Sequence, residues 1–207
     1  MEYLKPLVDE RRKAPKDDLI SALLNAEENG VSLSETALLG QIVLMLVAGH
    51  ETTVNLSGNG LLALLQHPDQ FQLLKNNTAL IDSAVEECLR FDSPVQTVKR
   101  LVGADMEFRG NKMRKGDLLV LFLGACIRDP AMFKEPNSFE ISRTDNKHLA
   151  FSSGIHHCLG AALARLEGQI ALRTIIEKLP EIKLSEQKLV HKRPFNLRGV
   201  KDLHVSF

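Results

Sequence analysis

Hydrophobic residues recur with helical spacing along much of the chain, and this pattern predicts a largely helical protein. Apolar stripes among charged residues predict short amphipathic helices at residues 3–13 and 19–28. Pro15 ends the first helix, and Asn29-Gly30 closes the second. Two small helices therefore come first along the chain.

A much longer helix is predicted at residues 34–65. Ser32 and Glu35 have the spacing of a capping box, and apolar residues follow them. The helix would be roughly 48 Å long at about 1.5 Å per residue, which is enough to cross a domain. Residues 38–47 are apolar on almost every side, and this is typical of a buried helix.

The middle of this helix, Ala-Gly-His-Glu-Thr-Thr at residues 48–53, breaks the apolar pattern. Glycine inside a helix costs about 1 kcal/mol relative to alanine, and threonine is a poor helix former. Such a departure from local preference is where a functional site is sought. The alternative interpretation is a mild kink at which Glu51 reaches solvent.

The second half of the chain alternates helices with short strands. Helices are predicted at residues 69–75, 79–91, 119–127 and 159–179. Short strands are predicted at residues 97–102 and 106–109 and within 182–207. Residues 129–149 have little periodicity and predict a long ordered loop, which in compact domains is usually functional. The pattern predicts a mostly α fold with small β sheets, and 207 residues are enough for one domain.

Composition narrows the class of protein. The chain has 207 residues, of which 44% are hydrophobic and 25% charged, and its net charge is zero. This is typical of a globular protein and gives no electrostatic reason to expect binding to nucleic acid or to an anionic membrane. The longest apolar run, residues 37–49, is interrupted by Gln41 and is too short to span a bilayer.

Cysteine usage favours a reducing compartment. Cys88, Cys126 and Cys158 are odd in number and widely spaced, so a disulfide framework is not expected. A cytoplasmic location is the prediction that follows.

Cys158 lies in the sequence Phe-Ser-Ser-Gly-Ile-His-His-Cys-Leu-Gly, residues 151–160, directly before a helical pattern. Backbone N–H groups and the positive end of a helix favour a thiolate at such a position, which could attack a substrate or bind a metal. One alternative is a buried structural cysteine. Another is a cysteine hydrolase using His156 or His157, although residues adjacent in sequence rarely point at each other.

Four features occur in order along the chain. They are the segment 48–53, Glu87-Cys88-Leu89-Arg90, the loop 136–143 and the cysteine loop 151–160. Together they resemble the cytochrome P-450 (haem-thiolate monooxygenase) superfamily, in particular its soluble bacterial class. The resemblance covers essentially the whole chain, but it corresponds only to the C-terminal half of a family member, so it implies a single partial domain over residues 1–207.

The cysteine loop matches the family pattern Phe-x-x-Gly-x-(His/Arg)-x-Cys-x-Gly. The chain departs from the family at Ser152, where bacterial members usually have glycine, and at Ile127, where many have asparagine. Neither residue replaces a haem ligand.

The resemblance implies a haem b (iron protoporphyrin IX) site. Cys158 would be the metal ligand, because thiolate is the axial ligand of iron in this family, as general accounts of haem ligation state. The other residues that would hold or surround the haem are Ala48, Gly49, Arg100, Phe151, Gly154, His156 and Gly160. Among these, His156 and Arg100 would bind the propionates, and Ala48 and Gly49 would leave room over the distal face.

The resemblance also assigns proton delivery and a structural network. Glu51 and Thr52 resemble the family's acid–alcohol pair, which supplies protons while oxygen is reduced. Glu87, Arg90 and Arg143 resemble a Glu-Arg-Arg network that braces the cysteine loop without taking part in catalysis. Cys88 and Cys126 match no functional position and are expected in the core.

The implied activity is monooxygenation of a small organic substrate with dioxygen and two electrons. Electrons would come from NAD(P)H through a ferredoxin- or flavodoxin-like donor, because the sequence has no dinucleotide or flavin motif of its own. The competing hypothesis is a non-catalytic, truncated fragment that lacks a complete haem and substrate pocket. An N-terminal half supplied as a partner would then be needed to complete the fold.

Overall fold

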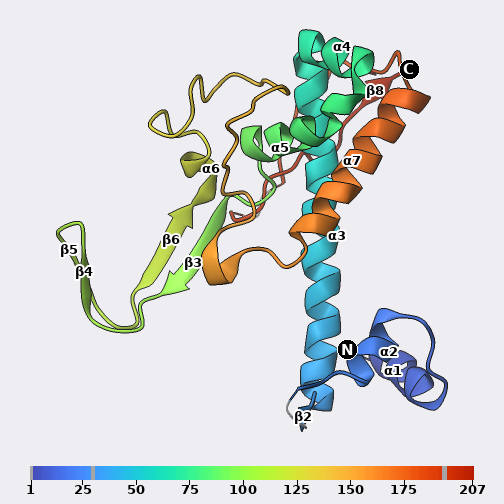
Figure 1. Cartoon of the computed structure of the whole chain (residues 1–207), viewed down its shortest axis with the longest axis vertical. Coiled ribbons are helices and arrows are strands. Elements are labelled where there is room, and N and C mark those ends of the chain that lie inside the picture. The colour runs from blue at the N-terminus through green and yellow to red at the C-terminus, as the bar shows by residue number, and fades with distance from the viewer. Residues whose placement is uncertain (1, 29–30, 193–194) are drawn as a thin grey trace. The chain divides into compact units, whose positions relative to one another are not determined.

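The protein is described by a computed structural model that covers residues 2–28, 31–192 and 195–207 (Figure 1). It divides into two compact units, Met1–Glu51 and Thr52–Phe207. Helix α3, Glu35–Gln66, contributes its first half to one unit and its second half to the other. The long helix expected at residues 34–65 is therefore confirmed, whereas the single domain over residues 1–207 stays a prediction.

The first unit is a small helical cluster. It contains α1 (Leu4–Lys13), α2 (Leu19–Leu24), a hairpin of β1 (Glu27–Glu28) and β2 (Val31–Ser32), and the beginning of α3. Its core consists of Leu4, Val8, Leu38, Leu39 and Ile42.

Helix α2 is shorter than the sequence predicted. Asp18 caps its first turn by accepting a hydrogen bond from the Ser21 N–H at 2.9 Å. The expected end at residue 28 is wrong, because Glu27–Glu28 pairs with the next segment as a strand instead of continuing the helix. The predicted closing residues, Asn29-Gly30, lie outside the described residues.

The second unit packs helices around one hydrophobic core. Its helices after α3 are α4 (Pro68–Asn76), η1 (Thr78–Leu80), α5 (Ile81–Phe91), α6 (Leu123–Cys126), η2 (Gly154–His156) and α7 (Ala161–Lys178). Leu56 and Leu64 of α3, Val85 of α5 and Leu172 of α7 meet in this core. Gly168 makes the approach possible, because a Cβ there would lie 3.1 Å from Leu56 and 3.2 Å from Val85.

Three two-stranded antiparallel sheets lie among the described residues of this unit. Strand β3 (Thr97–Leu101) pairs with β6 (Leu118–Phe122), β4 (Met106–Phe108) with β5 (Asn111–Met113), and β7 (Lys183–Leu184) with β8 (Val205–Ser206). In the first sheet Thr97 lies opposite Phe122 and Leu101 opposite Leu118.

The helix predicted at residues 119–127 is wrong for its first half. Residues 118–122 form β6 because their backbone groups pair with β3, and only Leu123–Cys126 is helical. A short apolar run fits a strand or a buried helix equally well, so periodicity could not separate the two. Residues 127–153 contain no helix or strand, so the loop predicted at residues 129–149 is confirmed.

The expected burial of residues 38–47 on all sides is not observed. Leu44 is 58% exposed, Leu46 59% and Val47 67%, whereas Leu38, Leu39 and Ile42 are buried. By length and mean hydropathy α3 could cross a membrane, but the core helix of a water-soluble protein passes the same test. The apolar face of α3 that carries Leu44, Leu46 and Val47 is therefore not covered by the described part of this chain.

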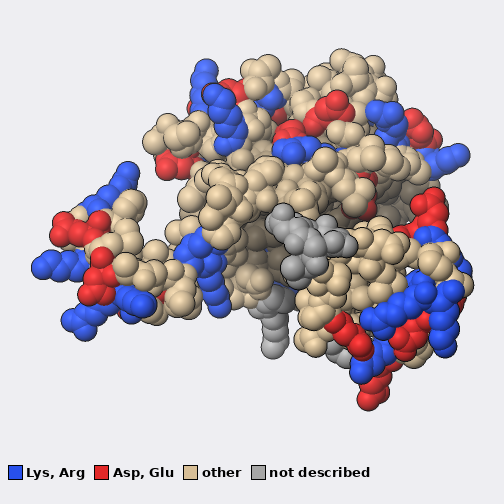
Figure 2. Space-filling model, turned by 60° about the horizontal axis from the view of Figure 1, so that its bottom comes forward, with Lys and Arg blue, Asp and Glu red and all other residues tan. Residues whose placement is uncertain are grey.

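Charges of both signs share the face of the molecule that Figure 2 shows. Lys and Arg side chains are intermixed with Asp and Glu on the face drawn in Figure 2, with wide areas between them that carry neither. The zero net charge of the sequence agrees with this mixture.

Candidate functional site

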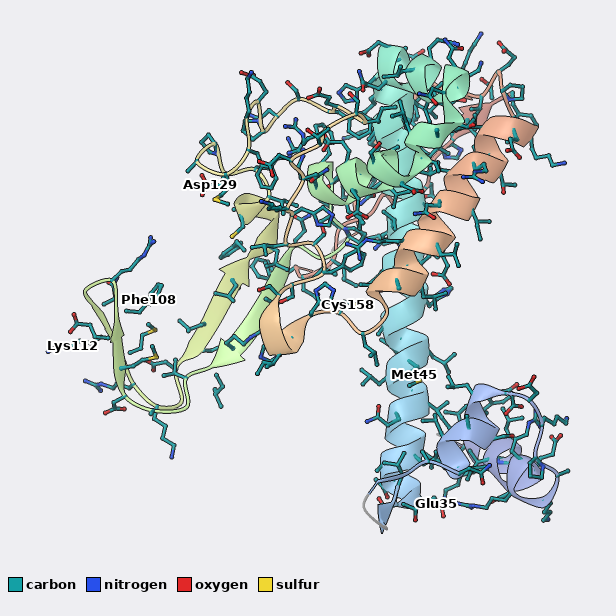
Figure 3. The ribbon with its side chains drawn as sticks, in the orientation of Figure 1. Glu35, Met45, Phe108, Lys112, Asp129 and Cys158 are labelled. Carbon is teal, nitrogen blue, oxygen red and sulfur yellow. The ribbon has the colours of Figure 1, made fainter. Side chains whose placement is uncertain are left out.

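Cys158 lies in the loop between η2 and the start of α7 (Figure 3). Its N–H donates to the Phe151 carbonyl at 2.9 Å, and its own carbonyl accepts from the Ala161 N–H at 3.2 Å. The side chain is exposed. The loop therefore presents the sulfur at the N-terminal end of an 18-residue helix, where the helix dipole favours negative charge.

Two residues of the loop have left-handed backbone conformations. Gly154 has φ +65° and Ser152 has φ +60°. Glycine adopts this conformation without strain, but serine does not. The departure from the family's glycine at residue 152 thus falls on a position where the backbone favours glycine.

The surroundings of Cys158 suit a metal whose other ligands come from a cofactor. The described residues contain no group of three or more His, Cys, Asp and Glu side chains that could hold an ion. The neighbouring apolar side chains are almost fully exposed, with Ile155 at 98% and Leu159 at 95%. A single soft thiolate beside exposed apolar surface fits haem, whose ring supplies the other ligands and is itself apolar.

The two residues expected to bind propionates lie on different elements. Arg100 is half-buried on β3 and donates to the Lys99 carbonyl at 2.8 Å. His156 lies in η2 and is exposed, and His157, which follows η2, is exposed too. Their contacts with a haem stay a prediction.

The α3 residues of the predicted site are Ala48, Gly49, Glu51 and Thr52, near the middle of the helix. Ala48 and Gly49 are exposed, and a Cβ at residue 49 would meet nothing within 4 Å. Glu51 and Thr52 are half-buried. Close packing against the described part of the chain therefore does not explain a glycine at residue 49, and room for a ligand stays the predicted reason.

A contact near this pair was missed by sequence reasoning. The Thr53 hydroxyl donates to Glu167 of α7 at 2.9 Å, which joins α3 to the helix that follows Cys158. The two residues are 114 positions apart, so no local pattern could have indicated the pair.

Glu87, Arg90 and Arg143 come together in the second unit. Arg90 binds the Glu87 carboxylate at 2.7 and 2.8 Å, and both side chains are fully buried. Arg143 reaches the same carboxylate from the loop at 3.2 Å. Opposite charges in fixed geometry offset the cost of burying each of them.

Glu87 also binds two groups that the sequence did not predict. It accepts from the Glu140 N–H at 2.8 Å and from the Asn146 side chain at 3.1 Å. Arg90 in turn donates to the carbonyls of Pro136 and Ser138 at 2.8 and 2.9 Å. The network thus fastens α5 to the loop that leads toward Cys158.

The other two cysteines differ from each other. Cys88 is buried as expected, and burial raises the pKa of its thiol. The prediction that Cys126 lies in the core is wrong, because its side chain is exposed. It ends the short helix α6, where Leu123 is the buried residue.

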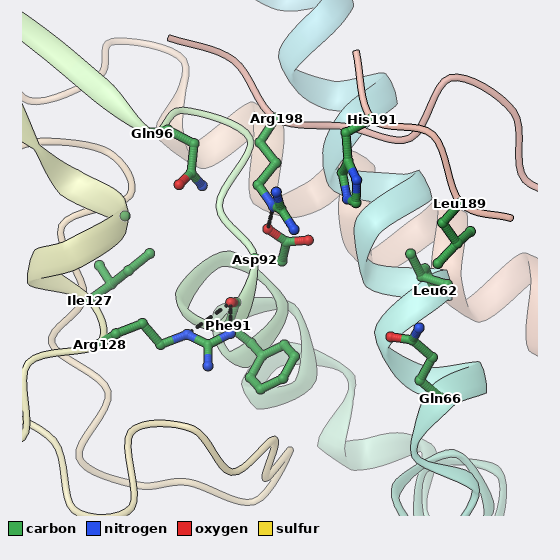
Figure 4. A pocket seen from close by; sticks show the side chains of 11 residues that line it. Leu62, Gln66, Phe91, Asp92, Gln96, Ile127, Arg128, Leu189, His191 and Arg198 are labelled. Atoms are coloured by element: carbon green, nitrogen blue, oxygen red, sulfur yellow. Dashed lines mark hydrogen bonds and ion pairs between the residues drawn. The ribbon is translucent and has the colours of Figure 1, made fainter. Parts of the chain in front are cut away.

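A cavity of about 350 Å³ lies elsewhere in the second unit (Figure 4). Its lining includes Asp92, Arg128 and Arg198, but none of the predicted site residues. Arg198 is paired with Asp92 at 2.6 Å, and Arg128 donates to the Phe91 carbonyl at 3.1 Å. The cavity is therefore not the predicted haem site, and its arginines already have partners.

A family model described as Cytochrome P450 matches residues 1–198 of the chain. The chain belongs to the cytochrome P450 family. The resemblance inferred from the motifs is confirmed, whereas the role of Cys158 stays a prediction.

Relatives from bacteria support this membership. The chain is 42% identical over 207 residues to the biotin biosynthesis cytochrome P450 of Bacillus subtilis and covers 52% of that protein. It is 43% identical over 208 residues to the vitamin D(3) 25-hydroxylase of Pseudonocardia autotrophica, again covering 52%. The chain spans about half the length of the curated relatives it matches.

Solved structures agree about the fold. The match to the Bacillus subtilis cytochrome P450 PksS has a TM-score of 0.96 at 44% identity, covering 99% of this chain and 54% of that one. P450BioI, in a complex with acyl carrier protein carrying hexadec-9Z-enoic acid, gives 0.94 at 42% identity, covering 100% and 53%. A half-length cytochrome P450 fold, mostly α with small sheets, is confirmed.

Proposed function

We propose that this chain is the haem-ligating half of a monooxygenase, with Cys158 as the thiolate ligand of haem b. The observation that carries the proposal is an exposed cysteine at the start of α7, beside exposed apolar residues, in a chain of this family. When bound, the haem supplies oxygen activation, and a thiolate ligand favours O–O cleavage. In the overall reaction a substrate C–H, dioxygen, two electrons and two protons give an alcohol and water.

Other residues of the chain would hold the haem and shield the sulfur. Arg100 and His156 would bind the propionates, since cations suit carboxylates. Phe151 would exclude water from the sulfur, and Gly154 and Gly160 would let the backbone approach the ring. Ala48 and Gly49 would leave space on the opposite face.

Glu51 and Thr52 would deliver the two protons. A carboxylate can exchange protons with solvent, whereas a hydroxyl can donate and accept in a dry site. Their half-buried positions on α3 are compatible with these roles.

The class of substrate and the partners are inferred from the proposed reaction and from the names of the relatives. The relatives' names include biotin biosynthesis and vitamin D(3) hydroxylation, so the family takes varied organic molecules. We propose a small organic substrate and a ferredoxin- or flavodoxin-like electron donor oxidising NAD(P)H elsewhere. With an electron donor of this kind, the proposed location is the cytoplasm.

The second candidate is a fragment without activity of its own. Half-length coverage and the exposed apolar faces of α3 and α7 favour it. On α7 Leu163, Leu166 and Ile170 lie at helical spacing and are exposed. Addition of the missing half separates the two candidates, because an incomplete enzyme would then gain haem and turnover.

The test of the proposed activity uses this chain together with the other half of the fold. Thr52→Ala should retain haem but release more of the reduced oxygen as peroxide, with less product per NAD(P)H. Glu51→Gln should chiefly slow turnover. Thr53→Ala is the matched control, because its hydroxyl binds Glu167, and it should keep the coupling of the parent. The proton-delivery role would be refuted if Thr52→Ala and Glu51→Gln both lost haem while the protein that still held haem formed as much product per NAD(P)H as the parent.

A further inference from the structure

A second charged cluster lies beside the cysteine loop and includes none of the residues assigned above. Its carboxylate is Glu86 of α5, which Arg165 of α7 binds at both oxygens, with distances of 2.7 and 3.0 Å. The His148 Nε2 lies 3.1 Å from the same carboxylate. Three segments that are distant in sequence therefore meet at one side chain.

His148 has a defined orientation in this cluster. Its side chain is only 2% exposed, and its Nδ1 lies 3.2 Å from the Ala150 N–H, which donates to it. The hydrogen-bond pattern assigns the ring hydrogen to Nε2, which donates to Glu86. The imidazole thus fixes the backbone directly before Phe151.

Phe151 connects the cluster to Cys158. The Arg165 guanidinium lies 4.6 Å from the centroid of the Phe151 ring, within the range of a cation–π contact. The His148 ring lies 6.1 Å from the same ring. The Phe151 carbonyl in turn accepts the Cys158 N–H at 2.9 Å.

We propose that Glu86, His148 and Arg165 form a positioning cluster that sets the geometry of the thiolate loop through Phe151. The inference rests on the proposed function, because the sulfur it orients is the predicted haem ligand. Arg165 acts through Phe151 and is a positioning residue, not a catalytic one.

This cluster is separate from the Glu87 network. Glu86 and Glu87 are adjacent on α5, but Glu87 binds Arg90 and the loop at residues 140–146, whereas Glu86 binds α7 and His148. Burial raises the pKa of Glu86, but hydrogen bonds from His148 and Arg165 outweigh burial and lower it to about 2. Glu87 therefore fastens α5 to the loop at residues 140–146, and Glu86 fastens α5 to His148, nearer to Cys158 in the same loop.

The first arm of the test uses the 207-residue chain without haem. Amide hydrogen exchange of a peptide covering residues 151–161 reports the Cys158 N–H bond to Phe151. In Arg165→Gln this exchange should be about tenfold faster, since the loop opens more often. The matched control is Arg198→Gln, which breaks the ion pair between Arg198 and Asp92. Neither residue of that pair bonds to Phe151 in the described structure, so hydrogen exchange at residues 151–161 should stay at the parent rate.

The second arm uses haem-loaded protein containing both halves of the fold. Arg165→Gln and Phe151→Leu should convert part of the reduced carbonyl complex to the form without thiolate ligation, and Arg165→Lys should restore part of the thiolate band. If Arg165→Gln does not fold, Glu86→Gln serves in both arms, because it keeps the size of the side chain.

The outcomes are distinguishable from those of the proposed function. Parent-like exchange and a parent-like thiolate band in the folded cluster variants, with lower thermal stability equal to that of Arg198→Gln, would show an ordinary interhelical ion pair and overturn the inference. If the parent protein has no thiolate band at all, the proposed function fails, and the exchange arm still decides whether the cluster orders the loop.

Discussion

At the scale of single residues, the backbone at Ser152 is the most direct structural consequence of a departure from the family pattern. Its φ of +60° places a side chain with a Cβ in the left-handed region, at a position where bacterial members usually have glycine. The cost for a non-glycine residue there is about 1–2 kcal/mol. Glycine removes that strain but loses about 0.5–1 kcal/mol through the entropy of the unfolded chain.

We therefore expect Ser152→Gly to raise the free energy of unfolding by about 0.5–1 kcal/mol, from the difference between these two effects. Gly154→Ala, at φ +65°, should lower it by about 0.5–1 kcal/mol, from the same two effects with opposite signs. Urea unfolding measures both changes. Gly103→Ala is the control, because its φ lies outside the left-handed region and the space around it is open. It should raise the free energy of unfolding by about 0.4–1 kcal/mol through the unfolded chain, and a loss there as large as that of Gly154→Ala would remove the strain explanation.

The Glu86 carboxylate gives a prediction about pH. Its pKa is about 2, against an ordinary 4.5, so the folded state favours the ionised form. The stabilisation is complete above about pH 4.5 and is lost as pH falls toward about 2. Because the side chain is 28% exposed, solvent screens part of this stabilisation, and we expect Glu86→Gln to lose about 2 kcal/mol at neutral pH.

Urea unfolding of Glu86→Gln and the parent at about pH 7 and about pH 3 measures this linkage. The difference between the two proteins should shrink at the lower pH. Glu140→Gln, with a more exposed carboxylate, is the control. A difference that stays constant over this range would show that the charge of Glu86 contributes nothing.

At the scale of elements, α5 and the loop after α6 depend on the buried Glu87–Arg90 pair. Glu87→Ala would leave Arg90 buried without a carboxylate, which costs on the order of 3–5 kcal/mol. We expect a protein that fails to fold or to retain haem, measured by soluble yield and haem content. Glu140→Ala keeps the backbone N–H that binds Glu87 and should behave like the parent. A stable Glu87→Ala protein with a normal spectrum would contradict the bracing role.

The elements show what the sequence could and could not predict. Helix α3 was predictable within about one residue at each end, because a capping signal, a long apolar pattern and His67-Pro68 mark it. Strand β6 was not, since its pairing with β3 is a long-range interaction that five apolar residues do not encode. The Glu87 network was predicted from the family pattern, but the Glu86 cluster joins residues up to 79 positions apart and has no local signature.

At the scale of the whole molecule, the exposed apolar residues correspond to the half-length match with the relatives. Fully burying a Leu, Ile, Val or Met side chain contributes about 1.5–3 kcal/mol, so four exposed ones forgo roughly 6–12 kcal/mol. That is comparable with the stability of a typical domain, about 5–15 kcal/mol. The chain has a core of its own in each unit, but a large apolar area remains without cover.

The isolated chain should therefore bind a dye specific for apolar surface and hold haem weakly. Co-expression with the first half of the Bacillus subtilis biotin biosynthesis cytochrome P450, a 42% identical relative, should reduce dye binding and raise the melting temperature. The control co-expresses an unrelated polypeptide of similar length. Full haem retention on desalting and no dye binding by the chain alone would show a self-sufficient fold.

The central claim is that Cys158 is the thiolate ligand of haem, and the spectrum of the reduced carbonyl complex tests it most directly. A haem-loaded sample containing this chain should show the red-shifted Soret band of thiolate ligation. Cys158→Ser should lose that band, while Cys126→Ser, which removes the other exposed thiol, should keep it. A red-shifted band that persists in Cys158→Ser would contradict the assignment.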